Sequence, residues 1–228
     1  ESSAIDQVRC AMHWRERSRG IEPMATSPDA SFRVADLTVV TATALEAGAV
    51  RRAAPAVRVV EAGIGLSRIR PGELGDLVVS CGLAGGLRTD LPTGSVVIPA
   101  TIMTPTGDTI TCDPELAAAL ARAAQHMATT VERGPLVTSA TLVTGTARQE
   151  WARRGYVAAD METGYIKARR LAAVRVILDT PQRELADAWL QPASALVRPW
   201  LWPQALWLWR NGPRCARLAA EVLAAALG

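Results

Sequence analysis

The chain has 228 residues, 49% of them hydrophobic and 21% charged, with a formal net charge of +3. These values are typical of one globular domain that can bury its own core without disulfide or metal support. The 25 basic residues include a single lysine and are scattered, without a basic stripe interleaved with aromatic residues. We therefore expect no nucleic-acid binding, and no apolar run is long enough to predict a membrane span.

Cysteine and histidine are too sparse for the common metal and disulfide sites. The four cysteines lie far apart without a CxxC pair, and the chain has only two histidines. We expect no metal site and no secreted disulfide framework, but reduced thiols in a cytoplasmic protein. The first residues lack the apolar segment of a signal peptide, which agrees with that location.

Residues 1–33 combine mixed charge, serine and proline without a sustained hydrophobic period. This composition predicts a loosely ordered leader, followed by a single domain over residues 34–228.

From residue 37 onward, short β-branched runs alternate with alanine- and leucine-rich stretches. We predict strands at 37–43, 57–65, 76–87, 95–104, 135–144, 156–162 and 171–179, a hairpin arm at 108–113, and helices at 44–53, 115–128, 147–155 and 213–227. This alternation predicts an α/β fold, a three-layer α/β/α arrangement with a central mixed, largely parallel sheet.

The C-terminal part changes composition, because residues 189–212 hold five of the seven tryptophans and several prolines. Pro213 suits the first turn of the last helix, whose apolar positions 215, 218, 222 and 226 share one face. The tryptophans suit a packed layer or a dimer interface, and alternatively a surface that contacts a membrane or a lipid-linked substrate.

Glycine turns and acidic residues follow several predicted strands. GIG (63–65) and GLAGG (82–86) lack the spacing of a dinucleotide-binding or P-loop motif. Glu46, the pair Met161-Glu162, and Asp179 also come directly after predicted strands. Ligands bind at the carboxyl ends of strands in open α/β sheets, so these positions predict a small-molecule site.

TALEA (43–47), EAGIG (61–65), CGLAGGL (81–87), ADMET (159–163) and VRVILDT (174–180) occur in an order that resembles the nucleoside phosphorylase superfamily. Within it the chain is similar to the methylthioadenosine/S-adenosylhomocysteine nucleosidases. It most resembles the hopanoid-associated phosphorylases, in CGLAGGL, in CDPELAA (112–118) and in the DME segment. The resemblance covers roughly residues 37–185.

The resemblance implies cleavage of the N-glycosidic bond of a purine nucleoside. Asp179 matches the acid that protonates the leaving base, and burial among apolar neighbours would favour its protonated form. Glu162 matches the glutamate that binds the ribose hydroxyls, Met161 the methionine that packs on the sugar, and Glu46 the glutamate that positions the attacking water. Backbone groups of four glycines would approach the nucleophile and the sugar: Gly63, Gly65, Gly82 and Gly85.

Each residue also has a structural interpretation. Glu46 could compensate the dipole at a helix N-terminus, and Asp179 could cap the turn before Pro181. Asp160 is interpreted as a structural hydrogen-bond acceptor.

Departures from the family decide between reaction types. At the positions where phosphorylases bind phosphate, this chain has Ser80 and Leu83, neither of which supplies a cation. This favours hydrolysis. Arg68 or Arg88 could supply the cation instead, and phosphate could then be a co-substrate. No other cofactor is implied. The crossovers before residue 76 and before residue 171 are unusually short, so a catalytically inactive nucleoside-binding relative is an alternative.

The aromatic residue that usually stacks on the purine is not obvious in this sequence. Tyr165 or a C-terminal tryptophan is one candidate, and aliphatic Leu142 or Val143 is the other. The resemblance further implies a homodimer and, through the hopanoid-associated relatives, a lipid-linked substrate such as adenosylhopane.

Overall fold

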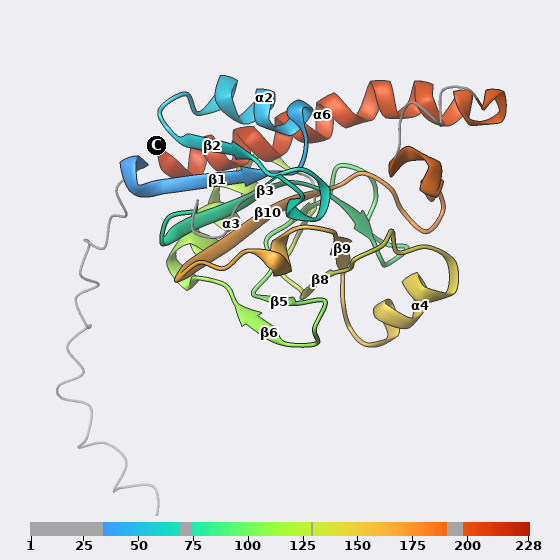
Figure 1. Cartoon of the computed structure of the whole chain (residues 1–228), viewed down its shortest axis with the longest axis horizontal. Helices are drawn as coiled ribbons and strands as arrows, with labels where there is room; N and C mark the ends of the chain where they lie inside the picture. Colours follow the sequence, from blue (N-terminus) through green and yellow to red (C-terminus); the bar gives the residue numbers. More distant parts are fainter. Residues whose placement is uncertain (1–33, 69–73, 129, 191–197) are drawn as a thin grey trace, which may run out of the picture. The chain divides into compact units, whose positions relative to one another are not determined.

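The computed structural model describes residues 34–68, 74–128, 130–190 and 198–228 (Figure 1). The predicted leader, residues 1–33, lies outside the described residues, and so do residues 191–197 of the tryptophan-rich segment.

The centre of the sheet is a parallel group of long, apolar strands. Their order is β2 (Arg58–Glu61), β1 (Leu37–Thr41), β3 (Leu77–Gly86) and β10 (Arg170–Ile177). All five residues of β1 are buried, as are all residues of β10 except its first. Continuous apolar runs of this kind are typical of parallel strands that are covered on both faces.

Shorter strands continue the sheet from β10 and from the end of β3. From β10 these are β4 (Val96–Val97) and β7 (Val131–Glu132), and from β3 they are β9 (Ala158–Asp160), β8 (Leu136–Thr138), β5 (Thr101–Met103) and β6 (Thr109–Thr111). β6 forms the predicted hairpin arm against β5. Among the described strands, β10–β4, β3–β9 and β5–β6 pair antiparallel and the other pairs are parallel. The predicted α/β fold with a mixed, largely parallel sheet is therefore confirmed.

Three long helices pack together over the central strands. α6 (Trp202–Leu227) contacts α2 (Ala44–Ala53) and α3 (Pro114–Met127), and it also lies on β3 and β10. α4 (Gly145–Arg153) belongs to a separate apolar cluster that includes side chains of β8 and β9. Short 3-10 turns complete the described elements: η1 (Val34–Asp36), η2 (Ile64–Leu66), η3 (Thr163–Tyr165), η4 (Asp187–Leu190) and η5 (Pro199–Leu201).

The last helix begins earlier than the sequence predicts. α6 starts at Trp202, so Pro203 occupies its first turn and Pro213 lies inside the helix. An internal proline removes one backbone hydrogen bond. The helix nevertheless continues through Pro213, because apolar residues recur at helical spacing before it. Among the described helices, including this one of 26 residues, none combines the length and the apolarity that a membrane span needs.

The link between β9 and β10 is as short as the sequence indicates. It contains η3 but no α-helix, and the chain returns to the sheet at Arg170. Ile166, in this link, is buried in the main core cluster. The short link is therefore packed into the core, and it joins the end of β9 to the start of β10.

Candidate active site

The predicted acidic residues meet at one cavity of about 220 Å³ at the ends of the central strands. Glu46 follows β1, Glu162 follows β9 and Asp179 follows β10. The cavity is lined by Ala42, Thr43, Glu46, Ile64, Leu83, Ala84, Gly85, Leu142, Ala159, Asp160, Met161, Glu162, Leu178, Asp179 and Leu185. The three predicted carboxylates thus face a common space, although they come from distant parts of the sequence.

Glu46 is buried and is held by backbone and side-chain donors. Thr43 caps α2, and the Glu46 carboxylate completes a capping box by accepting from the Thr43 N–H at 2.8 Å. Its Oε2 also accepts from the Thr43 hydroxyl at 2.9 Å. Oε1 accepts from the Leu83 N–H of β3 at 2.8 Å. The structural interpretation of Glu46 therefore holds in part, because the helix cap is what aims Oε1 toward β3.

Gly82 is the point at which two charged groups meet over β3. A Cβ added there would collide with Glu46 Oε1 and would lie 2.6 Å from Arg175 Nη1. Any larger residue would push these two groups away. Glycine is needed at this position for close approach, as the sequence predicts, but the approaching groups are side chains of the protein itself.

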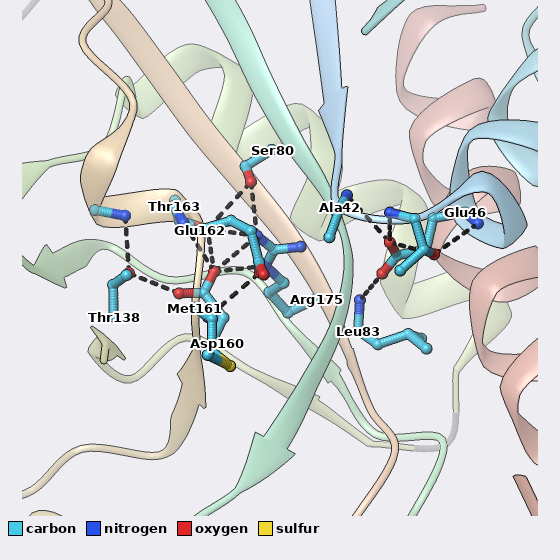
Figure 2. A network of polar contacts seen from close by, with 12 residues as sticks. Ala42, Glu46, Ser80, Leu83, Thr138, Asp160, Met161, Glu162, Thr163 and Arg175 are labelled. Atoms are coloured by element: carbon cyan, nitrogen blue, oxygen red, sulfur yellow. Dashed lines mark hydrogen bonds and ion pairs between the residues drawn. The ribbon is translucent and has the colours of Figure 1, made fainter. Parts of the chain in front are cut away.

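Arg175 lies in the middle of β10 and is 1% exposed. Figure 2 shows its guanidinium in a network with the side chains that follow β9. Its Nε donates to Asp160 Oδ2 at 2.9 Å, and its Nη2 donates to Ser80 Oγ at 2.7 Å and to Thr163 Oγ1 at 2.6 Å. Nη1 is buried and has no hydrogen-bond partner. A buried guanidinium N–H without a partner is costly, so this group is a strong donor toward a polar atom beside Gly82.

Asp160 has the structural role that the sequence predicts. Its Oδ1 accepts from Thr138 Oγ1 at 2.6 Å, and its Oδ2 accepts from Thr163 and forms an ion pair with Arg175 Nη2 at 2.7 Å. Both oxygens are thus engaged within the protein.

Glu162 is the second carboxylate beside Arg175, at 3.8 Å from Nη2. This distance is too long for a hydrogen bond, because Asp160 occupies the nearer position. Burial, together with the negative charge of Asp160, raises the pKa of Glu162 to about 7. Glu162 therefore changes charge near neutral pH, and a donor from a ligand would favour its ionised form.

Asp179 is 3% exposed at the end of β10. Its Oδ2 accepts from the guanidinium of Arg148 in α4, whose side chain is equally buried. A Cβ on Gly85 would lie 3.0 Å from Oδ1, so this oxygen faces the glycine turn. The expectation of purely apolar neighbours is wrong, because a buried cation that the sequence analysis missed compensates the burial of this carboxyl.

The remaining predicted residues differ in how close they lie to the cavity. Met161 and Gly85 line it, whereas Gly63 and Gly65 are absent from its walls. These two glycines have φ of 74° and 63°, which shapes the turn that carries Ile64. The nearest atom to a Cβ on Gly65 would be the carbonyl oxygen of Met161, at 3.9 Å.

The sequence left open whether an aromatic or an aliphatic residue stacks on the purine. Among the described residues, no aromatic side chain lines the cavity. Leu142 lines the cavity, and Val143 is buried in the cluster around β8 and β9. Tyr165 is not among the lining residues and is 37% exposed.

Arg68 and Arg88 do not supply a cation to the cavity. Arg68 pairs with Glu61, and Arg88 pairs with Asp90 and with Glu132. Arg175 is the residue that lies beside the site. Its signal in the sequence is an arginine in the middle of the run LAAVRVILD, since a charged residue in a buried strand requires a buried partner.

A second and larger cavity, of about 640 Å³, lies on the other side of Arg148. Its walls include Arg88, Gln149, Arg153 and Glu184, and none of the predicted site residues. Arg148 thus lines this second cavity and bonds to Asp179, which lines the first.

Comparison with known proteins agrees with this architecture. A family model described as "Phosphorylase superfamily" matches residues 34–187, which is more than half of the chain. The chain belongs to the phosphorylase superfamily. None of the curated protein sequences matches it.

Solved structures from several bacteria are similar to this chain. S-adenosylhomocysteine nucleosidase from Streptococcus pyogenes, in complex with 5-methylthiotubericidin, matches with a TM-score of 0.67 and 14% identity, over 86% of this chain and 98% of that one. The methylthioadenosine/S-adenosylhomocysteine nucleosidase from Neisseria meningitidis, in complex with methylthio-immucillin-A, has a TM-score of 0.62 and 17% identity, over 84% and 97%. Futalosine hydrolase from Helicobacter pylori has a TM-score of 0.61 and 14% identity, over 85% and 97%. At these identities the likeness shows the fold.

Proposed function

We propose that this chain is a nucleosidase that hydrolyses the N-glycosidic bond of an adenine nucleoside. The observation that carries the proposal is the position of Glu46 Oε1 and the unpartnered Arg175 Nη1 over Gly82, beside the cavity that Glu162 and Asp179 also line. An acceptor and a donor at one point can hold a water molecule in a defined orientation.

Glu46 positions the nucleophile in this scheme. Its Oε1 accepts one hydrogen bond from the Leu83 N–H, and a carboxylate oxygen can accept a second from water. The Nη1 of Arg175 is closed off from solvent in this structure, so it donates to the oxygen of the same water only once that water enters between it and Glu46. As the sugar gains oxocarbenium character, the water attacks C1′ and transfers a proton toward Glu46.

Glu162 and Met161 bind the sugar. The raised pKa of Glu162 means that hydroxyl donors from the ribose are needed to keep it ionised at neutral pH. Met161 adds an apolar contact on the same side of the cavity. Substrate binding and ionisation of Glu162 are thus linked.

Asp179 donates the proton that the purine needs in order to leave. Its Oδ2 is engaged by Arg148, which leaves Oδ1 for the N7 of the base. Arg148 holds this carboxyl in one orientation, so that Oδ1 is fixed where the base would accept the proton. Leu142 and Leu178 supply apolar surface for the ring.

Hydrolysis is favoured over phosphorolysis by the groups around Gly82. The Leu83 N–H, a backbone donor that could bind an anion, is already used by Glu46. Arg175 is neutralised by Asp160 at 2.7 Å, with Glu162 close by. A phosphate dianion would meet three carboxylates and one guanidinium, which is unfavourable at a poorly solvated site. The reaction needs water and no cofactor, and phosphate is a co-substrate in the alternative reaction.

The 5′ substituent of the substrate is proposed to be apolar. Ile64 and Leu185 provide aliphatic side chains in the cavity wall, and neither offers a hydrogen bond to a 5′-hydroxyl. Similarity to nucleosidases of methylthioadenosine and S-adenosylhomocysteine supports a thioether substituent. The resemblance to hopanoid-associated relatives supports a lipid-extended one such as adenosylhopane.

We further propose a cytoplasmic homodimer. Cys81, Cys112 and Cys215 are free and buried, as expected for a protein from a reducing compartment. The dimer rests on the resemblance to the superfamily, and sedimentation velocity of the purified chain tests it.

The test of the activity is release of adenine from 5′-methylthioadenosine, adenosine and adenosylhopane, each with and without phosphate. We expect adenine and the free sugar, at rates that do not depend on phosphate, and a loss of at least about 100-fold in Asp179→Asn. A sugar phosphate as product would show phosphorolysis. Absence of adenine with all three substrates, or full activity of Asp179→Asn, would overturn the proposal.

A further inference from the structure

The turn η5 and the first half of α6 carry an exposed apolar surface that the nucleosidase proposal does not use. Trp200 is 73% exposed, Trp202 59%, Leu206 53% and Trp209 73%. Spacings of four and three residues place Trp202, Leu206 and Trp209 on one face of the helix. We call this set the tryptophan face: Trp200, Trp202, Leu206 and Trp209.

This half of the helix does not belong to the core. The buried residues of α6 begin at Gly212 and continue through Leu223, whereas none of the positions from Trp202 to Asn211 is buried. In Figure 1 this orange-red half extends beyond the strands that the second half covers. An apolar surface of this size on a segment outside the core indicates a binding surface.

Two other tryptophans of the same segment contact side chains of the protein. Trp189 donates its indole N–H to Gln204 at 2.5 Å, and Trp207 lies under the guanidinium of Arg183 at 5.3 Å. Both are partly covered by the protein. The exposure of the tryptophan face is therefore specific to its residues, since other tryptophans of the same segment are partly covered.

The sequence segment that contains the tryptophan face carries only positive charges. The segment from residue 188 to residue 220 contains four arginines and no aspartate or glutamate. These arginines are exposed, and the last three follow the tryptophan face along the helix at spacings of four and three: Arg198, Arg210, Arg214 and Arg217.

We propose that the tryptophan face and its arginines dock this protein on the surface of an anionic lipid bilayer. Tryptophan is favoured at the membrane–water interface, where the indole ring lies among the headgroups, and arginine pairs with anionic lipid phosphates. The helix lies along the interface and does not cross it.

A second copy of the chain fits this surface less well. An isologous dimer brings the same surface of both copies together, so it would place two rows of arginines opposite each other. A bilayer that contains anionic lipids supplies the missing negative charge.

Docking would also bring the cavity near the bilayer. Gln204 of α6 accepts from the Ala186 N–H at 3.1 Å and donates to the Glu184 carbonyl at 2.8 Å. Leu185, between these two residues, lines the cavity. This last step rests on the proposed function, whereas docking itself does not, so vesicle binding and adenine release can fail independently.

The test is co-sedimentation with vesicles of equal parts phosphatidylglycerol and phosphatidylcholine, compared with phosphatidylcholine alone. We expect binding to the anionic vesicles that weakens as salt is added, and little binding to the neutral ones. Trp200→Ala/Trp209→Ala should lower the partition coefficient by more than about tenfold. Met127→Ala, which removes an exposed apolar side chain from the end of α3, is the matched control and should bind as the unmodified chain does.

A charge variant keeps the test valid if the tryptophan variant does not fold. Arg210→Gln/Arg214→Gln should lower the partition coefficient about 25-fold, at roughly fivefold for each arginine, and Arg51→Gln/Arg52→Gln on α2 should lower it little. Absence of binding to anionic vesicles, or equal binding of the surface and control variants, would overturn the proposal. So would a dimer that dissociates in Trp200→Ala/Trp209→Ala, because the surface would then be an interface between copies.

Discussion

Arg148 and Asp179 form an ion pair that is almost completely excluded from solvent, and it joins α4 to the end of β10. The rest of the guanidinium donates to backbone carbonyls, to Val143 O from Nη2 at 3.0 Å and to Gly86 O from Nη1 at 2.9 Å. Nε lies 3.4 Å from the carboxylate of Glu184. Asp179 is thus held in one orientation by a cation that is itself held by the backbone.

Arg148→Met should destabilise the protein by about 3–5 kcal/mol, because it leaves a buried carboxylate without its partner. The measurement is the free energy of unfolding in urea. The double variant Arg148→Met/Asp179→Asn should lose much less than the sum of the two single losses, since no charge is then left buried. Arg154→Met, directly after the same helix, removes a stacking contact with Trp151 and should cost no more than about 1 kcal/mol. Additive losses in the double variant would contradict a direct pairing.

Glu46→Gln should lower kcat by about 100-fold or more with little change in stability, since glutamine also completes a capping box but accepts a proton poorly. The kinetic measurement is adenine release. Thr43→Ala provides the comparison, because it removes the cap and leaves the carboxylate. It should lose about 1 kcal/mol of stability and much less activity. If both variants lost activity equally, Glu46 would act only by holding the helix.

Gly82→Ala should abolish activity, because its methyl group would displace both Glu46 and Arg175. A matched alanine substitution is available at Gly48 in α2, where an added Cβ would meet only the far end of Arg52, at 3.4 Å. Gly48→Ala should keep activity and raise stability by roughly 0.5–1 kcal/mol, as expected for glycine within a helix. An active Gly82→Ala enzyme would show that the two groups need not meet over this residue.

Sequence reasoning was most accurate where a pattern is local. The helix at α3 and the central strand at β3 lie within one residue of the predicted bounds, because alanine-rich helices and continuous β-branched runs follow from local preferences. The predicted strand at 95–104 is instead divided into β4 and β5, since β4 pairs with β10 and β7 whereas β5 pairs with β6 and β8. Pairing across the sheet is not encoded locally.

The site was predicted through its acids but not through its cations. Glu46, Glu162 and Asp179 stand at strand ends, where a sequence pattern can find them. Arg148 and Arg175 lie within a helix and within a strand, and their importance comes from partners that are distant in sequence. Only the folded chain brings those partners together. The roles of the predicted residues in the reaction stay predictions.

The raised pKa of Glu162 predicts an acid limit on activity. The ribose hydroxyls need an ionised acceptor, so kcat/KM should fall as the pH drops below about 7. Glu162→Gln should lose most of its activity and also lose this part of the pH profile. A profile that is flat from pH 5 to pH 8 in the unmodified enzyme would contradict the assignment of Glu162 to the sugar.

The same carboxyl should make stability depend on pH. Its pKa rises from 4.5 for the free side chain to about 7 in the folded protein, so the folded state binds the additional proton between these values. The stabilisation is complete below pH 4.5 and is lost as the pH rises through 7. A variant without this carboxyl should therefore gain free energy of unfolding, relative to the unmodified chain, as the pH rises. The gain between low and high pH should be about 3 kcal/mol.

Thermal unfolding of Glu162→Gln and the unmodified chain at pH 5 and pH 8 measures this dependence. The Tm of the variant relative to the unmodified chain should be higher at pH 8 than at pH 5, by roughly 5–10 °C. Glu150→Gln, which alters an exposed carboxylate on α4, should show the same difference at both pH values. Comparing differences cancels any loss of packing that glutamine causes, because that loss does not depend on pH. An equal Tm difference for Glu162→Gln at both pH values would mean that Asp160 and Arg175 leave Glu162 ionised throughout this range.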